Sequence, residues 1–113
     1  MASAGEINAV ETCGVNLAFS VVSSKWKPTI LWLLSSGPRR FAALRRDVGE
    51  ISEKVLAQQL RELQRDGIVR RDERGGFPLH VEYRLTPAGV ALDEALDPLD
   101  SWAREHLGRR GAP

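Results

Sequence analysis

The side chains with the clearest capacity for chemistry lie on one side of a helical segment, residues 52–66. At about 100° per residue, four hydrogen-bond donors cluster on one face: Lys54, Gln58, Arg61 and Arg65. Lysine and arginine can neutralise phosphates or donate to guanine, and a glutamine carboxamide can make two hydrogen bonds to adenine. Ala57 lies beside them, where it can contact a thymine methyl group. This face has the groups needed to read the edge of a duplex groove.

The alternative is that this polar face is only solvated, as most polar helix faces are. Its surroundings favour binding, because arginines precede it at 39, 40, 45 and 46 and follow it at 70, 71 and 74. Arg74, beside Gly75 and Gly76, would stand at a hairpin tip, where an arginine can enter a narrow minor groove. The alternative for Arg70 and Arg71 is pairing with neighbouring carboxylates. The further DNA contacts predicted are Arg39, Arg40, Ser52, Arg71 and Arg74.

The lone Cys13 carries the other reactive group. One cysteine cannot close a disulfide within the chain, and with only His80 and His106 it cannot complete a structural zinc site. A thiol enzyme is disfavoured because the sequence shows no base partner and no Cys-x-x-Cys pair. We therefore expect no enzyme activity, no metal and no cofactor, and a reducing cytoplasm as the compartment.

The sequence has 113 residues, which suits one compact domain, and its 42% hydrophobic and 27% charged residues are typical of a globular protein. The net charge is only +1, but residues 25–74 hold 12 Lys or Arg against 7 Asp or Glu, and residues 75–113 hold 4 against 6. The longest apolar run, residues 30–34, is too short to cross a bilayer. The N-terminus lacks the basic start of a secretory signal. We expect no membrane contact and a basic middle for an anionic partner.

These residues are positioned by elements with clear boundaries in the sequence. The patterns predict helices at residues 16–23, with Asn16 as N-cap, then at 26–35, 41–47 and 52–66, the last capped by Ser52 and stopped by Gly67. Alternation at residues 80–85, after a stretch at 68–74, predicts an antiparallel hairpin. Thr86 and Pro87 then open a last helix that ends near Gly108. The fold class is mainly α with a small antiparallel β-hairpin (α+β), a winged helix-turn-helix.

Within this fold the sequence resembles the HxlR family of bacterial winged-helix regulators, which are MarR-like dimers, from Cys13 to Trp102. The residues that carry the resemblance are Lys25-Trp26-Lys27, Gly37-Pro38-Arg39-Arg40-Phe41, Leu44-Arg45-Arg46, Ile51-Ser52-Glu53-Lys54-Val55-Leu56, Leu60-Arg61-Glu62-Leu63, Asp66-Gly67-Ile68-Val69, Val81-Glu82-Tyr83-Arg84-Leu85-Thr86 and Gly89. The expected organisation is a family domain at residues 13–108, between a flexible N-terminal tail at 1–12 and a C-terminal tail at 109–113.

The resemblance also implies a homodimer formed by the first and last helices. The residues expected at that interface are Val15, Leu17, Phe19, Leu92, Leu96, Leu99 and Trp102. The apolar stripe of the last helix supports this independently, because it is larger than so small a core can cover. The alternative is that the stripe packs on Trp26, Trp32 and Phe19 within one subunit.

In some relatives a cysteine before the first helix senses oxidants or electrophiles, and Cys13 occupies that position. A thiol at a helix N-terminus gains thiolate character, the reactive form. Against this, the common Cys-Pro of the family is Cys13-Gly14 here, and no basic residue is near in sequence. The alternative is a passive, buried cysteine. His80 replaces a basic residue of relatives, which favours a solvated strand histidine.

Together these features predict a sequence-specific transcriptional regulator, a repressor that binds an inverted-repeat operator as a homodimer. Its partners would be double-stranded DNA, a second copy of the chain, and a small-molecule or oxidant effector acting through Cys13. Two alternatives stay open. One is a protein-interaction module on the same fold, favoured by the near-neutral total charge. The other is a regulator that responds to a small molecule without thiol switching.

Overall fold

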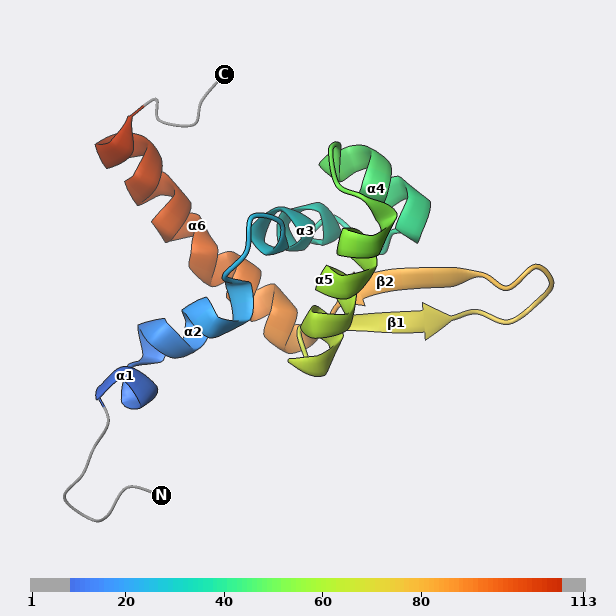
Figure 1. Ribbon diagram of the computed structural model, residues 1–113, viewed down its shortest axis with the longest axis horizontal. Helices are drawn as coiled ribbons and strands as arrows, with labels where there is room; N and C mark the ends of the chain where they lie inside the picture. The colour runs from blue at the N-terminus through green and yellow to red at the C-terminus, as the bar shows by residue number, and fades with distance from the viewer. Residues whose placement is uncertain (1–8, 109–113) are drawn as a thin grey trace, which may run out of the picture.

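The computed structural model of the protein describes residues 9–108, in which helices precede and follow one hairpin (Figure 1). The elements in chain order are α1 Ala9–Thr12, α2 Gly14–Val22, α3 Lys27–Leu34, α4 Phe41–Val48, α5 Glu53–Arg65, β1 Val69–Glu73, β2 Val81–Leu85 and α6 Pro87–Leu107. The hairpin projects to one side of α3, α4 and α5, and α2 and α6 extend to the other side (Figure 1). No helix within residues 9–108 combines the length and apolar character needed to cross a membrane.

The core forms where α3, α4 and α5 meet. Leu56, Leu60 and Leu63 of α5 are fully buried, which confirms the inward face predicted for this helix. They pack with the other fully buried side chains, which are Ile30, Leu31 and Leu44. Burial of each such side chain contributes on the order of 2 kcal/mol to folding. The opposite face of α5 is thereby fixed outward.

Two helix starts have the caps predicted from the sequence. The Ser52 hydroxyl accepts a hydrogen bond from the backbone N–H of Val55 at 3.1 Å, and the Thr86 hydroxyl accepts one from Gly89 at 3.1 Å. Each satisfies a backbone donor that the first turn leaves without an intrahelical partner. Gly67 follows α5 with a φ of 75°, the left-handed conformation that glycine adopts without strain.

The prediction for the first long helix is wrong at its start. Cys13, not Asn16, is the N-cap of α2, and its backbone is extended, with φ −72° and ψ 119°. Its N–H donates to Ala9 at 3.1 Å and its carbonyl accepts from Leu17 at 3.0 Å, so the chain is helical on both sides of it. Asn16 therefore lies inside α2. Residues 9–12 of the predicted tail form α1, while residues 1–8 and the predicted tail at 109–113 lie outside the described residues.

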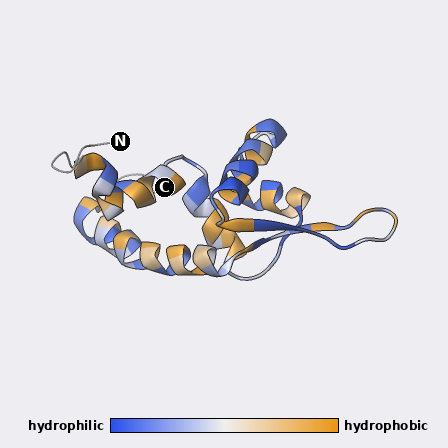
Figure 2. Ribbon diagram, turned by 90° about the horizontal axis from the view of Figure 1, so that it is seen from below, coloured by the Kyte–Doolittle hydropathy of each residue, from blue (hydrophilic) through white to orange (hydrophobic). Residues whose placement is uncertain are grey.

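The hairpin pairs β1 with β2 in antiparallel register, from Val69 opposite Leu85 to Glu73 opposite Val81. Hydrophobic ribbon lies where the hairpin joins the helices, and further out hydrophilic and hydrophobic stretches both occur (Figure 2). The chain between α3 and α4 adds a third segment, because Arg39 and Tyr83 exchange two backbone hydrogen bonds of 3.0 and 2.8 Å. This bridge, absent from the sequence-based prediction, ties the hairpin to the helix-turn-helix.

Candidate nucleic-acid interface

The outward face of α5 presents its donors to solvent. Lys54, Gln58, Arg61 and Arg65 are all exposed, and Ala57 is half-buried beside them. Within residues 9–108, Lys54 and Arg61 form no ion pair, and neither does Arg40 at the N-cap of α4. These cations are therefore available to an anionic partner without giving up an internal contact. Arg40 precedes α4, and a short turn connects α4 to α5 (Figure 1).

Two residues of this face have side-chain partners near the C-terminal end of α5. The Gln58 Nε2 donates to Glu62 Oε2 at 3.2 Å, and Arg65 pairs with Asp66 at 3.3 Å. Ion pairs between exposed groups are worth about 1 kcal/mol or less, so a phosphate can replace the Arg65 contact. Ser52 uses its hydroxyl as the helix cap and is itself exposed.

The hairpin carries a ladder of ion pairs. The structure shows the pairing alternative for Arg70 and Arg71, since Arg70 pairs with Asp72 and Arg71 with Glu73. Arg74 follows β1 directly, before the glycine pair, and its guanidinium lies 3.2 Å from Glu82. His80 also contacts Glu82, at 3.0 Å, and these two contacts, His80 first, hold the pKa of the Glu82 carboxyl below its usual range. DNA contact by Arg71 and Arg74 stays a prediction.

Arg39 has a different environment from the other arginines predicted to contact DNA. It is half-buried, and its Nε donates to the Leu33 carbonyl at 2.9 Å. Its Nη1 pairs with Asp47 at 2.7 Å and its Nη2 donates to the Ser36 hydroxyl at 3.0 Å. The guanidinium therefore joins the end of α3 to α4. DNA contact by Arg39 stays a prediction, and its bonds within the chain give it a structural role in holding the end of α3 against α4.

We expect Arg39→Lys to lower the free energy of unfolding by about 2 kcal/mol, because an ammonium cannot reproduce three separately directed donors. Urea denaturation followed by circular dichroism measures this change. Arg40→Lys is the matched control, since Arg40 is the exposed neighbour and forms no ion pair within the described chain. Equal unfolding midpoints for the two variants would show that the Arg39 bonds contribute nothing to stability.

Lys27 and Glu62 form a contact that sequence reasoning did not find. The Lys27 side chain is buried, and its Nζ lies 2.5 Å from Glu62 Oε1. The Lys27 ammonium, followed by the Gln58 amide, holds the pKa of the Glu62 carboxyl below its usual range. The two residues are 35 positions apart, so no local pattern reports the contact.

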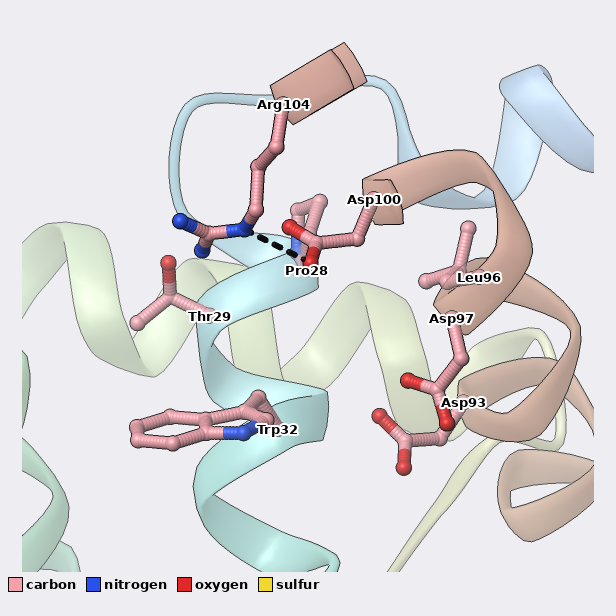
Figure 3. Close-up of a pocket in the computed structure, with 8 residues that line it drawn as sticks. All are labelled: Pro28, Thr29, Trp32, Asp93, Leu96, Asp97, Asp100 and Arg104. Atoms are coloured by element: carbon pink, nitrogen blue, oxygen red, sulfur yellow. Dashed lines mark hydrogen bonds and ion pairs between the residues drawn. The ribbon is translucent and has the colours of Figure 1, made fainter. Parts of the chain in front are cut away.

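A cavity of about 470 Å³ lies between α3 and α6, which supply all of its lining residues (Figure 3). Trp32 of α3 lies on one side, and Asp93 and Asp97 of α6 lie on the other, while Asp100 pairs with Arg104 at 2.9 Å (Figure 3). Burial, and then the charges of Asp97 and Glu94, raise the pKa of the Asp93 carboxyl. The cavity has the size and mixed lining of a small-molecule site.

The apolar stripe of α6 is divided between two environments. Leu92 and Leu96 pack against the core, whereas Leu99 is 47% exposed and Trp102 is 51% exposed. Three large apolar side chains of α2 are also exposed: Val15, Leu17 and Phe19. Packing within one subunit therefore covers only part of the stripe, because Trp26 packs against the same core as Leu92 and Leu96 whereas Trp32 and Phe19 stay exposed. A second cavity, of about 500 Å³, separates Phe19 from Leu99 and Ala103.

Cys13 lies in the open at the start of α2. Its side chain is exposed, so the interpretation of a buried cysteine is wrong for the single subunit. Gly14, which follows it, has no atoms within 4 Å of the position a Cβ would take. No group of three histidine, cysteine or acidic residues within residues 9–108 is placed to hold a metal ion.

Comparison with known proteins agrees with this architecture. A family model described as HxlR-like helix-turn-helix matches residues 21–110. The HTH-type transcriptional regulator YtfH of Escherichia coli (strain K12) is 40% identical over 97 residues, which cover 86% of this chain and 77% of YtfH.

Two structures show the same fold. A crystal structure of a MarR-family transcriptional regulator from Enterococcus faecalis V583 is similar with a TM-score of 0.80 and 32% identity, covering 100% of both chains. The redox regulator HypR in its reduced form is similar with a TM-score of 0.80 and 31% identity, covering 89% of this chain and 100% of HypR. YtfH and the Enterococcus faecalis protein are transcriptional regulators, a class of proteins that are not enzymes. The chain belongs to the HxlR-like helix-turn-helix family, and it is a DNA-binding transcriptional regulator with a winged helix-turn-helix fold.

Proposed function

We propose that the protein acts in the cytoplasm as a homodimeric repressor that binds an inverted-repeat operator with one α5 helix in each half-site. The observation that carries this proposal is the outward face of α5, where exposed donors stand opposite three fully buried leucines. A helix held in this way can enter a major groove, which admits an α-helix and displays a distinct donor and acceptor pattern for each base pair. Occupation of a promoter by the dimer would block transcription.

The apolar surfaces of α2 and α6 support the homodimer. Phe19 and Leu99 are each 47% exposed and flank the 500 Å³ cavity, which a second copy can fill. A two-fold axis makes one patch cover the same patch on the partner subunit. Binding to two half-sites further requires that this axis place the two α5 helices about one DNA turn, roughly 34 Å, apart. The chain is 57 Å long in its longest dimension. The hairpin lies toward one end of that dimension and the far ends of α2 and α6 lie toward the other, so a dimer contact through α2 and α6 does not cover the hairpin (Figure 1).

We expect Leu99→Glu to weaken dimerisation by about 100-fold, because a charge would be buried in an apolar contact at a cost of about 3 kcal/mol. Sedimentation equilibrium measures the dissociation constant of the dimer. The control is Phe77→Glu, which places the same charge on an exposed apolar residue of the hairpin loop. If both variants dimerise as tightly as the wild type, α6 does not form the interface.

Selection of bound duplexes from a random library tests the proposed function. The expected result is one enriched sequence with two inverted half-sites about 10 base pairs apart, centre to centre. The protein-interaction alternative predicts no enriched sequence, together with a stable complex with another protein. The basic residues Arg40, Lys54 and Arg61, free of ion pairs within the described chain, favour DNA over that alternative.

Two observations favour a response to oxidants through Cys13: the thiol is exposed, and the similar structure HypR is a redox regulator. In the proposed step, Cys13 and Cys13 of the partner subunit lose two protons and two electrons to an oxidant and form one disulfide. The bond would alter the separation of the two α5 helices. The cavity between α3 and α6 is the proposed site of the other class of signal, a small-molecule effector.

Treatment with the thiol oxidant diamide is expected to change operator affinity by about tenfold, a typical allosteric coupling of 1–3 kcal/mol. Fluorescence anisotropy with a labelled operator reports the change, and dithiothreitol should reverse it. Cys13→Ser should bind the operator equally well before and after treatment. An equal response by wild type and Cys13→Ser would exclude the thiol as the sensor.

A further inference from the structure

A chain of contacts leads from the buried start of α3 to the face of α5 proposed to contact DNA. Lys27 Nζ lies 2.5 Å from Glu62 Oε1, and the other oxygen of that carboxylate, Oε2, accepts from Gln58 Nε2 at 3.2 Å. Lys27 is 4% exposed, whereas Gln58 is fully on the surface. The exposed amide is therefore connected, through one carboxylate, to a group that cannot move freely.

Lys27 is held in place at its backbone as well as at its side chain. Its backbone N–H donates to the Ser24 hydroxyl at 2.9 Å, and that hydroxyl donates to Gln59 Oε1 at 2.8 Å. Gln59 is itself buried on α5. The chain that leads into α3 thus meets α5 at two points, Ser24 with Gln59 and Lys27 with Glu62. A buried ammonium requires its carboxylate partner, which restrains Glu62 in turn.

The chemistry of the carboxylate fixes which way the Gln58 amide faces. An ionised carboxylate only accepts hydrogen bonds, so the NH₂ end of the amide must face Glu62. The amide oxygen and the second N–H remain for the groove. That pair matches adenine, which offers an acceptor at N7 and a donor at N6, and does not match guanine, which offers two acceptors. An amide oriented before binding also loses less side-chain entropy when it binds.

We propose that Lys27 and Glu62 are positioning residues that orient the Gln58 amide and thereby set the preference for adenine over guanine at one operator position. The inference rests on the proposed function, because it assumes that α5 lies in the major groove. Neither Lys27 nor Glu62 needs to contact DNA. Their effect is on which atoms of Gln58 face the base.

The substitution Glu62→Gln tests this orientation directly. The oxygen of the new amide can still accept from Lys27, but its NH₂ group would face the NH₂ group of Gln58. Gln58 should turn its amide over and present NH₂ to the groove, which suits the two acceptors of guanine. The expected result is a loss of at least tenfold in the preference for adenine over guanine at one position, with the other positions unchanged.

Glu53→Gln is the matched control, because it removes the same charge from α5 while its carboxylate contacts Arg45 and not Gln58. Competition binding with operators substituted one base pair at a time measures each preference, and Gln58→Ala identifies the base pair concerned. If Glu62→Gln is too unstable, Lys27→Met with Glu62→Leu replaces the pair by apolar side chains and should cause the same loss of preference.

The outcomes separate the inference from the function on which it rests. If the wild type selects an operator, Gln58→Ala affects one position and Glu62→Gln leaves the preference at that position intact, the positioning role is overturned and the proposed function stands. If Gln58→Ala changes the base preference at no operator position, the inference is overturned as well. A wild type that selects no sequence overturns the proposed function itself.

Discussion

Replacement of Lys54, Gln58 and Arg61 together by alanine is expected to lower operator affinity by about 1000-fold, since each base or phosphate contact contributes about 1–3 kcal/mol. The prediction follows from their position on one exposed face and from the absence of ion pairs for Lys54 and Arg61 within residues 9–108. Fluorescence anisotropy at fixed salt measures the affinity. Because the three side chains point away from the core, the free energy of unfolding should change by about 0.5 kcal/mol or less.

The matched control is the triple replacement of Lys25, Gln64 and Arg104 by alanine, which removes the same three residue types from outside the outward face of α5. Gln64 belongs to α5 but is half-buried, and its Nε2 donates to the Leu60 carbonyl. It should leave operator affinity within about threefold of the wild type, because the salt-dependent part of binding arises only from cations near phosphates. The slope of log affinity against log salt should fall by about 2 for the α5 variant. Equal losses for both triple variants would indicate general charge attraction and no role for α5.

Gly89→Ala is expected to destabilise the protein by about 3 kcal/mol or more, because it forces a side chain into a filled space. A Cβ at residue 89 would lie 2.2 Å from the backbone oxygen of Ile68 and 3.2 Å from Leu85 Cδ2. The Ile68 oxygen cannot retreat easily, since it accepts a 3.0 Å hydrogen bond from the backbone of Thr86. The first turn of α6 therefore contacts the backbone of Ile68, the residue before β1, at this glycine. This contact fixes where the hairpin leaves the helices.

Gly14→Ala is the control for this prediction, because residue 14 is helical and has open space around it. Alanine there should be neutral or stabilise by up to about 1 kcal/mol. Urea denaturation of both variants gives the comparison. Equal unfolding midpoints would show that the strand and helix separate at this point without cost, contrary to the packing described.

The sequence predicted those parts of the fold that local signals determine. Ser52 and Gly67 bound α5, and Thr86 with Pro87 opens α6, because caps and stops act within one helical turn. The prediction of Asn16 as the cap was wrong: Asn16 has the right residue type, but a helical turn at residues 9–12 precedes α2, and the N-cap of α2 is Cys13. Cap preference alone could not reveal that turn.

The parts of the site that the sequence did not predict depend on contacts between distant residues. Arg39 looked like a member of a basic cluster, but tertiary folding brings Leu33, Ser36 and Asp47 around its guanidinium. The Lys27 and Glu62 pair arises from the packing of α3 on α5 and has no sequence pattern.

The sequence also showed the apolar stripe of α6 as one surface. The structure divides it, with Leu92 and Leu96 against the core and Leu99 and Trp102 exposed. The division depends on which part of α6 packs against the core, and periodicity along one helix does not encode that packing.

The most direct test of the central claim, that the outward face of α5 meets DNA, is a titration of the ¹⁵N-labelled protein with its selected operator duplex, followed by amide NMR. We expect the largest changes in residues 52–66 and near Arg40, with smaller changes near Arg74 in the hairpin and none in the second half of α6. Changes concentrated on α2 and α6, with residues 52–66 unaffected, would contradict the account.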